Sequence, residues 1–243
     1  MLLQKLMSPA RRAIEDYNMI EDGDNIAVGL SGGKDSLTLL YIMAGIKRYY
    51  PKKFGLCAVT VDMGLCPDPS EVEAVKKICA ELGVEYRIVP TQIGEVIFNI
   101  KKESNPCSLC AKMRRGALNT AAIEMGCNKI ALGHHADDLA ETFFLSLFYE
   151  GRISTFAPVT KMERSGITAI RPMIYIEEKD IASFAKDKPV IHNPCPANKH
   201  TQRQVIKEML NSIQKDIPIA KDRVLTALTH PERNNLFTRP EKK

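Results

Sequence analysis

The sequence predicts an α/β protein built on a parallel sheet, because short apolar runs alternate along the chain with longer segments of helical pattern. The runs that read as strands are rich in β-branched residues and lie at Asn25–Leu30, Leu56–Val61, Tyr86–Val89 and Lys129–Leu132, with a weaker fifth near Ile167–Ile170. The helical patterns between them lie at Lys34–Tyr49, Ser70–Leu82, Cys110–Met125 and Ala136–Tyr149. Helices of this length between short buried strands are typical of βαβ units with right-handed crossovers.

Both ends of the chain predict helices outside this sheet. The first 20 residues have an amphipathic pattern without a continuous apolar block, which favours a helix over a signal peptide. After a proline-rich loop that begins at residue 189, two closing helices are expected at Thr201–Ile213 and Ile217–Leu228, followed by a polar tail. We therefore expect an N-terminal helix at 1–20, a main domain at 21–190, and a C-terminal part at 191–243 that holds a cysteine loop, the closing helices and the tail.

The composition narrows the class of protein. A chain of 243 residues that is 44% hydrophobic can bury one large core. No apolar stretch approaches the roughly 18–20 residues of a membrane span, so we expect a cytoplasmic protein with no membrane partner. The net charge of +5 permits a nucleic-acid partner without requiring one. Seven cysteines, an odd number, argue against a closed set of disulfides and point to metal or redox chemistry in a reducing compartment.

The segment Ser31–Ser36, with the sequence S-G-G-K-D-S, predicts a phosphate site because it joins the first strand to the first long helix. Paired glycines let backbone N–H groups approach an oxyanion, and the helix N-terminus adds positive character. Lys34 would neutralise phosphate charge, and the hydroxyls of Ser31 and Ser36 would donate hydrogen bonds. The spacing differs from the Walker loop, which needs four residues between its glycines. An ordinary strand–helix turn is the alternative interpretation.

Four polar segments are expected at one edge of the sheet, where parallel strands present their carboxyl ends to ligands. The Ser31–Ser36 loop follows the first strand, and Asp62 ends the second. A C-x-x-C motif, Cys107 to Cys110, lies in the connection after the third strand, and the segment from Gly133 to Asp138 follows the fourth. Random placement would have put some of these segments at the opposite edge.

Asp137, Asp138 and Glu141 lie in the first turns of a predicted helix. Carboxylates are favoured there by unpaired N–H groups and by the helix dipole, so helix capping is one interpretation. Two adjacent aspartates that face a phosphate loop could also help to hold Mg²⁺, which takes carboxylate and phosphate oxygens together. The neighbouring His134 and His135 have a structural and a catalytic interpretation, and the pattern does not decide between them.

The C-x-x-C motif has three interpretations: half a zinc site, a redox pair, or ligands of an iron–sulfur cluster. His192 and Cys195 could complete a zinc site. Cys195, which stands between two prolines in a loop, is also the candidate third ligand of a cluster, and three cysteines leave one iron open to sulfur. Cys57, Cys79 and Cys127 fall in strand or helix patterns and are expected to act as small buried hydrophobes. Cys66 follows Asp62, with packing as its default role.

Several of these motifs resemble those of known enzymes. S-G-G-K-D-S is similar to the loop of the PP-loop ATP pyrophosphatases, which cleave ATP between the α and β phosphates. G-H-H-x-D-D at Gly133–Asp138 resembles a second motif of the tRNA-modifying members. Together with C-S-L-C-A-K-M-R-R-G from Cys107, with Cys195, and with T-Q-R-Q from Thr201, they resemble the tRNA 2-thiocytidine synthetase family over most of the chain.

This resemblance implies a Rossmann-like parallel sheet of the PP-loop type with a small C-terminal helical appendage. It implies ATP- and Mg²⁺-dependent thiolation of a tRNA pyrimidine, cytidine 32 in that family, through an adenylated O2 and with a [4Fe-4S] cluster. The nucleotide-binding residues would be Ser31, Gly32, Gly33, Lys34, Asp35, Ser36, Asp62 and Gly133. The catalytic residues would be Lys34, Asp35, Asp137 and Asp138, and the cluster ligands Cys107, Cys110 and Cys195. Lys112, Arg114 and Arg115 would offset the cluster charge or contact RNA, unless they form only a solvated helix face.

The implied partners are tRNA and a sulfur donor, either free sulfide or sulfur derived from a cysteine desulfurase, with a possible homodimer. Two other function classes stay open. A PP-loop ligase or amidotransferase could act on a small molecule or another tRNA base, with zinc or no metal at the cysteines. A non-catalytic RNA- or nucleotide-binding module is the third, although Lys34, Asp35, Asp137 and Asp138 argue against it. Relatives that thiolate uridine 54 carry extra zinc-finger cysteine pairs, which this sequence lacks.

Overall fold

The structure, a computed structural model, describes residues 2–65, 68–101, 106–191, 195, 202–233 and 235–236. By their internal contacts the residues form two compact units. The first unit comprises Met1–Ala136 and Ala157–His200, and the second comprises Asp137–Phe156 and Thr201–Lys243. In this division residues 137–156 group with the C-terminal helices.

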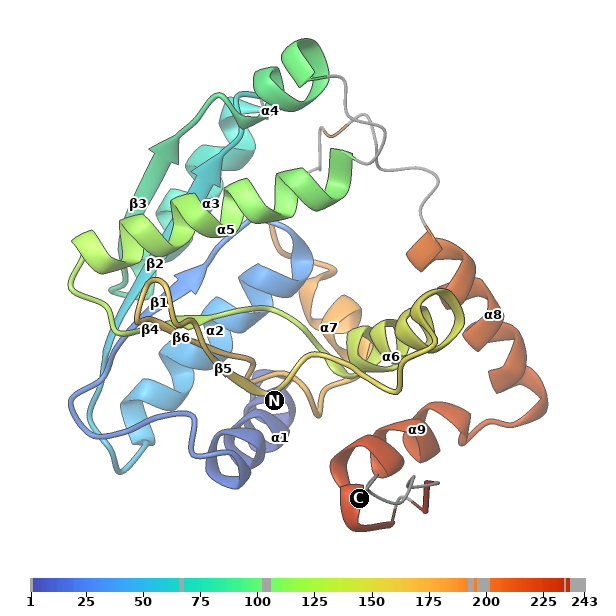
Figure 1. The fold of residues 1–243 in the computed structure, drawn as a ribbon. Coiled ribbons are helices and arrows are strands. Elements are labelled where there is room, and N and C mark those ends of the chain that lie inside the picture. The colour runs from blue at the N-terminus through green and yellow to red at the C-terminus, as the bar shows by residue number, and fades with distance from the viewer. Residues whose placement is uncertain are drawn as a thin grey trace, which may run out of the picture. The chain divides into compact units, whose positions relative to one another are not determined.

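The first unit contains a six-stranded sheet with the order β3-β2-β1-β4-β6-β5 (Figure 1). The strands are β1 (Asn25–Gly29), β2 (Gly55–Asp62), β3 (Glu85–Pro90), β4 (Lys129–Ala131), β5 (Val159–Lys161) and β6 (Thr168–Ile170). All neighbours pair in parallel except β5, which pairs with β6 in the antiparallel direction. The predicted parallel α/β sheet is confirmed, including the strand near Ile167–Ile170.

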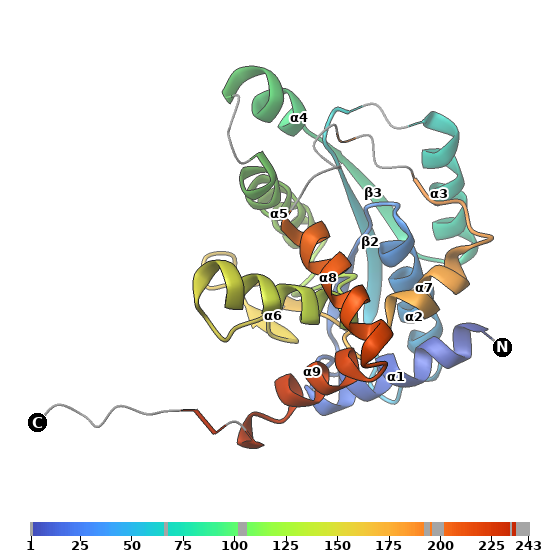
Figure 2. The ribbon, with the colours of Figure 1, turned by 90° about the vertical axis from the view of Figure 1, so that its right-hand side faces the viewer.

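Helices cover both faces of this sheet. Those of the first unit are α1 (Leu2–Asp16), α2 (Lys34–Tyr49), α3 (Pro69–Glu81), α4 (Ile93–Glu95), α5 (Pro106–Glu124) and α7 (Glu178–Ala185), with a π-helix at Val96–Lys101. Figure 2 shows the sheet edge-on, with α5 on one face and α2, α3 and α7 on the other. Helix α2 contacts β1 and β2 on one side and α1 and α7 on the other. Being covered on two sides, α2 is buried almost all round from Ser36 to Ala44.

Two differences from the expected elements bear on the site. Helix α5 begins at Pro106 rather than at Cys110, so both cysteines of the C-x-x-C motif lie in its first turns instead of in the preceding connection. Proline is well suited to the first position of a helix, where its missing N–H has no partner to lose. The second difference is α7, a helix that the sequence analysis did not expect.

The edge of the sheet opposite the phosphate loop is held together by Asp24. Its side chain accepts hydrogen bonds from Lys129 Nζ at 2.7 Å, from Asn128 Nδ2 at 2.7 Å and from the backbone N–H of Glu21 at 2.6 Å. Its carbonyl accepts the N–H of Gly55 at 2.7 Å. Asp24 and Lys129 are both buried. The carboxylate of Asp24 therefore joins the start of β4 to the turn that leads into β1, and its backbone carbonyl joins the same turn to the start of β2.

The second unit packs three helices, α6 (Ala136–Glu150), α8 (Gln202–Asp216) and α9 (Ala220–Thr229), with a short 3₁₀ turn at Pro231–Arg233. Its core is formed by Ala140, Ile206 and Leu210, against which Phe144, Leu145, Met209 and Val224 pack. The predicted closing helices are thus present. Within the described residues, none of the helices combines the length and the apolar character that crossing a membrane requires.

Candidate active site

The loop Ser31–Ser36 lies between β1 and α2, as expected, and Gly32 adopts a left-handed φ of +79°. The two serine hydroxyls bind within the loop. Ser36 Oγ donates to the carbonyl of Gly33 at 3.0 Å and accepts the backbone N–H of Ser31 at 3.1 Å. Ser31 Oγ lies 3.0 Å from Ser36 Oγ and accepts the N–H of Gly33 at 3.4 Å. The hydroxyls therefore shape the loop, while the N–H groups at the start of α2 are the donors available to an anion.

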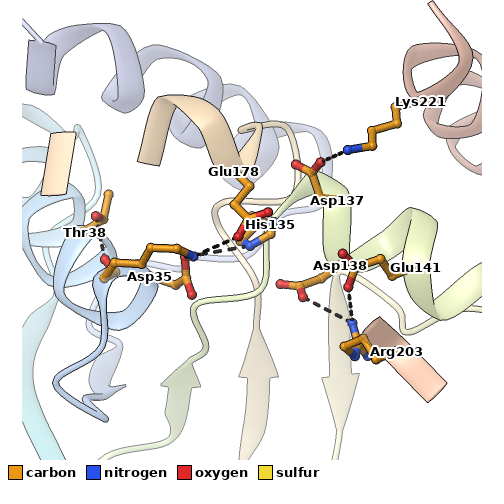
Figure 3. Close-up of polar contacts among 10 residues, drawn as sticks. Asp35, Thr38, His135, Asp137, Asp138, Glu141, Glu178, Arg203 and Lys221 are labelled. Atoms are coloured by element: carbon orange, nitrogen blue, oxygen red, sulfur yellow. Dashed lines mark hydrogen bonds and ion pairs between the residues drawn. The ribbon is translucent and has the colours of Figure 1, made fainter. Parts of the chain in front are cut away.

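Lys34 lies between two carboxylates of the first unit. Its Nζ is 2.7 Å from Asp35 Oδ1 and 3.1 Å from Glu178 Oε1 on α7. Burial alone would lower the pKa of Lys34, but the hydrogen bonds and charges of Asp35 and Glu178 outweigh burial and raise it above its ordinary value. Lys34 therefore carries a positive charge at neutral pH. Figure 3 shows Asp35, Glu178 and His135 around this position, with His135 Nε2 3.7 Å from Asp35 Oδ1.

Gly133 serves the loop by its lack of a side chain. It follows β4, and a Cβ atom at this position would lie 3.2 Å from Asp35 C and from Ser36 N, both backbone atoms at the start of α2. Backbone cannot move away as a flexible side chain can. Gly133 therefore lets the chain after β4 pass directly against the phosphate loop.

Asp62 ends β2 at the same edge, as expected. Its Oδ1 accepts the N–H of Gly64 at 2.9 Å, and its carbonyl accepts the N–H of Thr91 at 2.9 Å and Thr91 Oγ1 at 2.7 Å. These contacts shape the turn that follows the strand. The next residue, Met63, brings its sulfur to 3.6 Å from Cys110 Sγ. The turn after β2 thereby contacts the helix that carries the C-x-x-C motif.

The three predicted cysteine ligands belong to the first unit. Cys107 is exposed, while Cys110 and Cys195 are half-buried. Burial raises the pKa of the Cys110 thiol, the negative charges of Cys195 and Cys107 raise it further, and Arg114 opposes the rise. No three His, Cys, Asp or Glu side chains in the described ranges already stand close enough together to hold a metal ion. The thiols fit a soft metal or cluster by their chemistry, and Arg114 would offset its negative charge.

The predicted carboxylates of the second unit are paired with basic residues that the sequence analysis did not assign to them. Asp137 Oδ1 lies 2.8 Å from Lys221 Nζ on α9, and both side chains are largely buried. Arg203 Nη1, on α8, lies 3.3 Å from Asp138 Oδ1 and 3.0 Å from Glu141 Oε2 (Figure 3). Burial raises the pKa of Glu141, and the charge of Arg203 lowers it only in part. These contacts hold the start of α6 to α8 and α9.

The remaining cysteines and histidines are placed as follows. Cys57, Cys79 and Cys127 are buried, as expected, and the sulfurs of Cys57 and Cys127 lie 3.4 Å apart in the core. Cys66 and His192 lie outside the described residues. His135 is 4% exposed, and its Nε2 lies 3.7 Å from Asp35 Oδ1, whereas both interpretations of His134 stay open.

Glu178 and Lys221 are the two residues of these clusters that sequence reasoning missed. Glu178 lies 144 positions from Lys34 in the chain, and nothing in its own surroundings marks it beyond a place in the first turn of a helix. Lys221 looks like one of many solvated lysines. A local signal for Arg203 existed, because it stands in the T-Q-R-Q segment, but its carboxylate partners could not be inferred from spacing alone.

Comparisons with known proteins place these observations in a wider group. A family model described as a PP-loop domain matches residues 4–213. The tRNA-cytidine(32) 2-sulfurtransferase of Geobacter metallireducens is 38% identical over 241 residues, which cover 97% of this chain and 93% of that protein. The protein of the same name from Aliivibrio fischeri is 41% identical over 231 residues, which cover 93% of this chain and 75% of that one.

Solved structures show the same likeness. The U34-tRNA thiolase NcsA from Methanococcus maripaludis, solved with its [4Fe-4S] cluster, matches with a TM-score of 0.78 and 26% identity, covering 97% of this chain and 81% of that chain. An NH3-dependent NAD synthetase from Campylobacter jejuni matches with a TM-score of 0.50 and 16% identity, covering 98% of this chain and 99% of that chain. The second match shows the shared fold alone.

Proposed function

This chain belongs to the PP-loop family and, within it, to the tRNA-cytidine(32) 2-sulfurtransferases, and we propose that it uses ATP to replace O2 of cytidine 32 in tRNA with sulfur. The observation that carries the proposal is the phosphate loop. Lys34 stands at the start of α2, where the carboxylates of Asp35 and Glu178 hold its ammonium group in place. A cation fixed at a helix N-terminus fits a pyrophosphate group.

The chemistry follows from where charge develops. The pyrimidine O2 would attack the α-phosphorus of ATP, forming an O–P bond while the bond to the leaving pyrophosphate breaks. Negative charge then grows on phosphoryl oxygens, where the N–H groups at the start of α2 and the ammonium of Lys34 stabilise it. Sulfide would next attack C2 of the adenylated base, and AMP would leave with the former O2. Ser31 and Ser36 support the first step, the attack on ATP, because their hydroxyls hold the phosphate loop in shape.

The carboxylates near the phosphate loop and at the start of α6 are the proposed ligands of Mg²⁺. Asp35 is the candidate in the first unit, and Asp137 and Asp138 follow two and three residues after His135 in the chain. Carboxylate oxygens are the protein ligands that Mg²⁺ takes together with phosphate oxygens. Asp137 is engaged by Lys221 and Asp138 by Arg203. A role in metal binding therefore requires these basic side chains to share or release their carboxylates.

Cys107, Cys110 and Cys195 are the proposed ligands of a [4Fe-4S] cluster. The chemistry of the three thiols supports this set, since thiolates are the ligands that iron–sulfur clusters take, and Arg114, one turn after Cys110 on α5, would offset the negative charge of such a cluster. When bound by three cysteines, such a cluster supplies an iron with a position open to sulfur. The contact between Met63 and Cys110 would help to hold α5 against the turn after Asp62. Lys112 and Arg115 are exposed on the same helix and are proposed to contact RNA phosphates.

The partners follow from this reaction. We propose tRNA as substrate and, as sulfur source, either free sulfide or sulfur released by a cysteine desulfurase. A reducing, cytoplasmic compartment fits both the tRNA and the reduced thiols. A homodimer stays a prediction, which the mass of the protein in solution would test.

The decisive experiment is reconstitution. The full chain, purified without oxygen, is incubated with ATP, Mg²⁺, sulfide and unmodified tRNA, and the tRNA nucleosides are identified by mass spectrometry. We expect 2-thiocytidine, with AMP and pyrophosphate formed in equal amounts. A different thionucleoside would reassign the target base. A colourless protein with stoichiometric zinc that still consumes ATP would favour a PP-loop ligase and contradict the cluster.

A further inference from the structure

Two cysteine side chains that the proposed reaction does not use meet in the core of the first unit. The sulfurs of Cys57, on β2, and Cys127, in the turn between α5 and β4, lie 3.4 Å apart although 70 positions separate them in the chain. A disulfide brings its two sulfurs to about 2.05 Å, so this contact would have to shorten by about 1.4 Å. Small rotations of the two side chains can supply that movement.

The backbone on both sides of this contact is fixed by hydrogen bonds. In the sheet, Cys57 pairs with Ala27 of β1 on one side and with Glu85 of β3 on the other. The N–H of Cys127 donates to the carbonyl of Ala122 at 2.9 Å, which closes the end of α5. Groups that the fold already holds together lose little further chain entropy when a bond joins them, which favours a disulfide between these thiols.

The two thiols differ in reactivity. Cys57 can donate a hydrogen bond to the sulfur of Cys127, and this bond lowers the pKa of Cys127 although burial and the charge of Glu85 oppose it. The same hydrogen bond raises the pKa of Cys57. Because the thiolate is the nucleophilic form of cysteine, Cys127 is the sulfur that attacks first. Cys79 offers a contrast within the same unit, since burial raises its pKa to about 11.

We propose that Cys57 and Cys127 are a site of reversible oxidation, at which hydrogen peroxide joins them in a disulfide. Peroxide is close to water in size, and the thiols are 7% and 8% exposed. Cys127 attacks one peroxide oxygen and becomes a sulfenic acid, while the other oxygen leaves as water with the proton of Cys127. Cys57 then attacks the sulfur of Cys127, and the sulfenic oxygen leaves as a second water with the proton of Cys57. Each sulfur gives up one electron, the peroxide takes up both, and a dithiol reductant reverses the step.

The disulfide would act on the helix that carries the C-x-x-C motif. Helix α5 packs against β2 (Figure 1). Near the start of the helix, Cys110 Sγ lies 3.6 Å from Met63 Sδ in the turn after β2. Just beyond its end, Cys127 contacts Cys57. A bond at the second contact would therefore fasten α5 to the sheet whatever the state of the cysteines near its start. Neither ATP nor tRNA takes part, so this oxidation and the proposed function can fail independently.

The first test follows every cysteine of the full wild-type chain during exposure to hydrogen peroxide. The remaining thiols are alkylated under denaturing conditions, and peptide mass spectrometry identifies alkylated, oxidised and linked peptides. We expect Cys57 and Cys127 to enter one linked peptide at least about tenfold faster than Cys79 is oxidised, because Cys79 is buried with a raised pKa.

Single variants assign the order of attack. In Cys57→Ala the sulfenic acid of Cys127 has lost its partner thiol and should be trapped by dimedone. In Cys127→Ala the thiol of Cys57 should survive the same exposure. Cys79→Ala is the matched control from the core and should form the linked peptide at the wild-type rate.

The second test measures the effect on stability. It uses a full chain that keeps Cys57, Cys79 and Cys127 and has serine at the other four cysteine positions. Peroxide should raise its melting temperature by at least about 4 °C, as expected when a bond closes a long loop, and dithiothreitol should reverse the rise. Adding Cys57→Ala should abolish it. Oxidation of Cys127 to a sulfinic acid without a linked peptide, loss of the pair no faster than Cys79, or a disulfide that leaves the melting temperature unchanged would each overturn the proposal.

Discussion

Lys34 is the single side chain on which the nucleotide chemistry depends most directly. Lys34→Ala removes a charge-assisted contact to phosphate, worth about 1.5–3 kcal/mol, or roughly ten- to 150-fold in rate. We expect pyrophosphate release to fall at least tenfold. The melting temperature should change little, because the ion pairs of Lys34 with Asp35 and Glu178 are about one-third exposed and contribute little stability. Release is measured with a coupled phosphate assay at saturating tRNA.

Lys47→Ala is the matched control, since this exposed lysine lies on the same helix in its last turn. It should leave both pyrophosphate release and melting unchanged. Normal pyrophosphate release by Lys34→Ala would contradict the role of the loop. A large fall in melting temperature would instead show that Lys34 acts through stability.

A site residue can be predicted from the sequence when its role follows from its immediate neighbours in the chain. Gly32, Gly33 and Lys34 are predictable because a glycine pair and a lysine between a strand and a helix are typical of phosphate binding. The sequence also predicts Gly133 at the same edge of the sheet, but its close approach to the backbone of Asp35 is a tertiary contact that no local pattern encodes. Glu178 could not be found, because its only distinguishing feature is a tertiary contact with Lys34.

At the scale of elements, the start of α6 is joined to α9 by the pair of Asp137 and Lys221. Removing one partner of a largely buried ion pair costs about 3–5 kcal/mol, whereas neutralising both costs far less. We expect Asp137→Asn and Lys221→Met each to lower the melting temperature, and the double variant to regain most of it. If Asp137 also binds Mg²⁺, the regained protein should stay inactive, with some activity restored by excess Mg²⁺.

Activity in the stable double variant would assign Asp137 to structure alone. The exposed pair of Lys76 and Glu73 on α3 is the control. The corresponding double variant, Glu73→Gln with Lys76→Met, should change neither melting nor turnover, because exposed pairs contribute little.

The segment that carries Cys195 is the second element with a testable role. Cys195→Ser should lose most of the iron and sulfide of the reconstituted protein and abolish thiolation. ATP should still bind, because the phosphate loop belongs to a different segment. Cys79→Ala is the control, because Cys79 lies on the buried face of α3 and is 1% exposed. This variant should keep the iron of the reconstituted protein at some cost in stability. A full cluster in Cys195→Ser would make Cys66 the next candidate ligand.

The elements that the sequence predicted share strong local patterns, and the missed ones lack them. Strands β1, β2 and β4 have continuous apolar runs because both faces of a parallel sheet are covered. Strand β5 is as short as β4, but its Thr160 and Lys161 are exposed, whereas all three residues of β4 are buried, so β5 lacks an apolar run. Helix α7 has eight residues, fewer than the window in which helical periodicity stands out. The predicted start of α5 at Cys110 is too late, because a proline such as Pro106 does not continue a helical pattern although it is well suited to the first position of a helix.

At the scale of the whole molecule, the candidate site residues lie at the carboxyl ends of the strands, whereas a buried ion pair that stabilises the fold lies at the opposite edge of the sheet. The carboxyl edge gathers Lys34, Asp62 and Gly133, which serve the loop and its neighbours. The opposite edge is closed by Asp24, which is 3% exposed and binds Lys129. Burial opposes ionisation of Asp24, yet hydrogen bonds from Lys129, from the Glu21 N–H and from Asn128 hold its pKa below the ordinary value.

This lowered pKa predicts how stability depends on pH. A carboxyl whose pKa is lower in the folded state than in the unfolded state contributes its full stability above the unfolded value, about 3.9, and loses it as pH falls through the folded value. Asp24→Asn leaves Lys129 buried without its counter-charge, at a cost of about 3 kcal/mol near neutral pH. The difference in free energy of unfolding between wild type and variant should be constant above about pH 5 and shrink at lower pH.

Urea unfolding at a series of pH values measures this difference directly. The exposed Glu73→Gln variant, treated in the same way, should follow wild type at every pH to within about 0.5 kcal/mol. A difference for Asp24→Asn that stays constant down to pH 3 would mean that the hydrogen bonds of Asp24, and not its charge, hold this edge together. A shrinking difference assigns the effect to the ion pair, because only protonation of Asp24 in the wild type makes the two proteins alike.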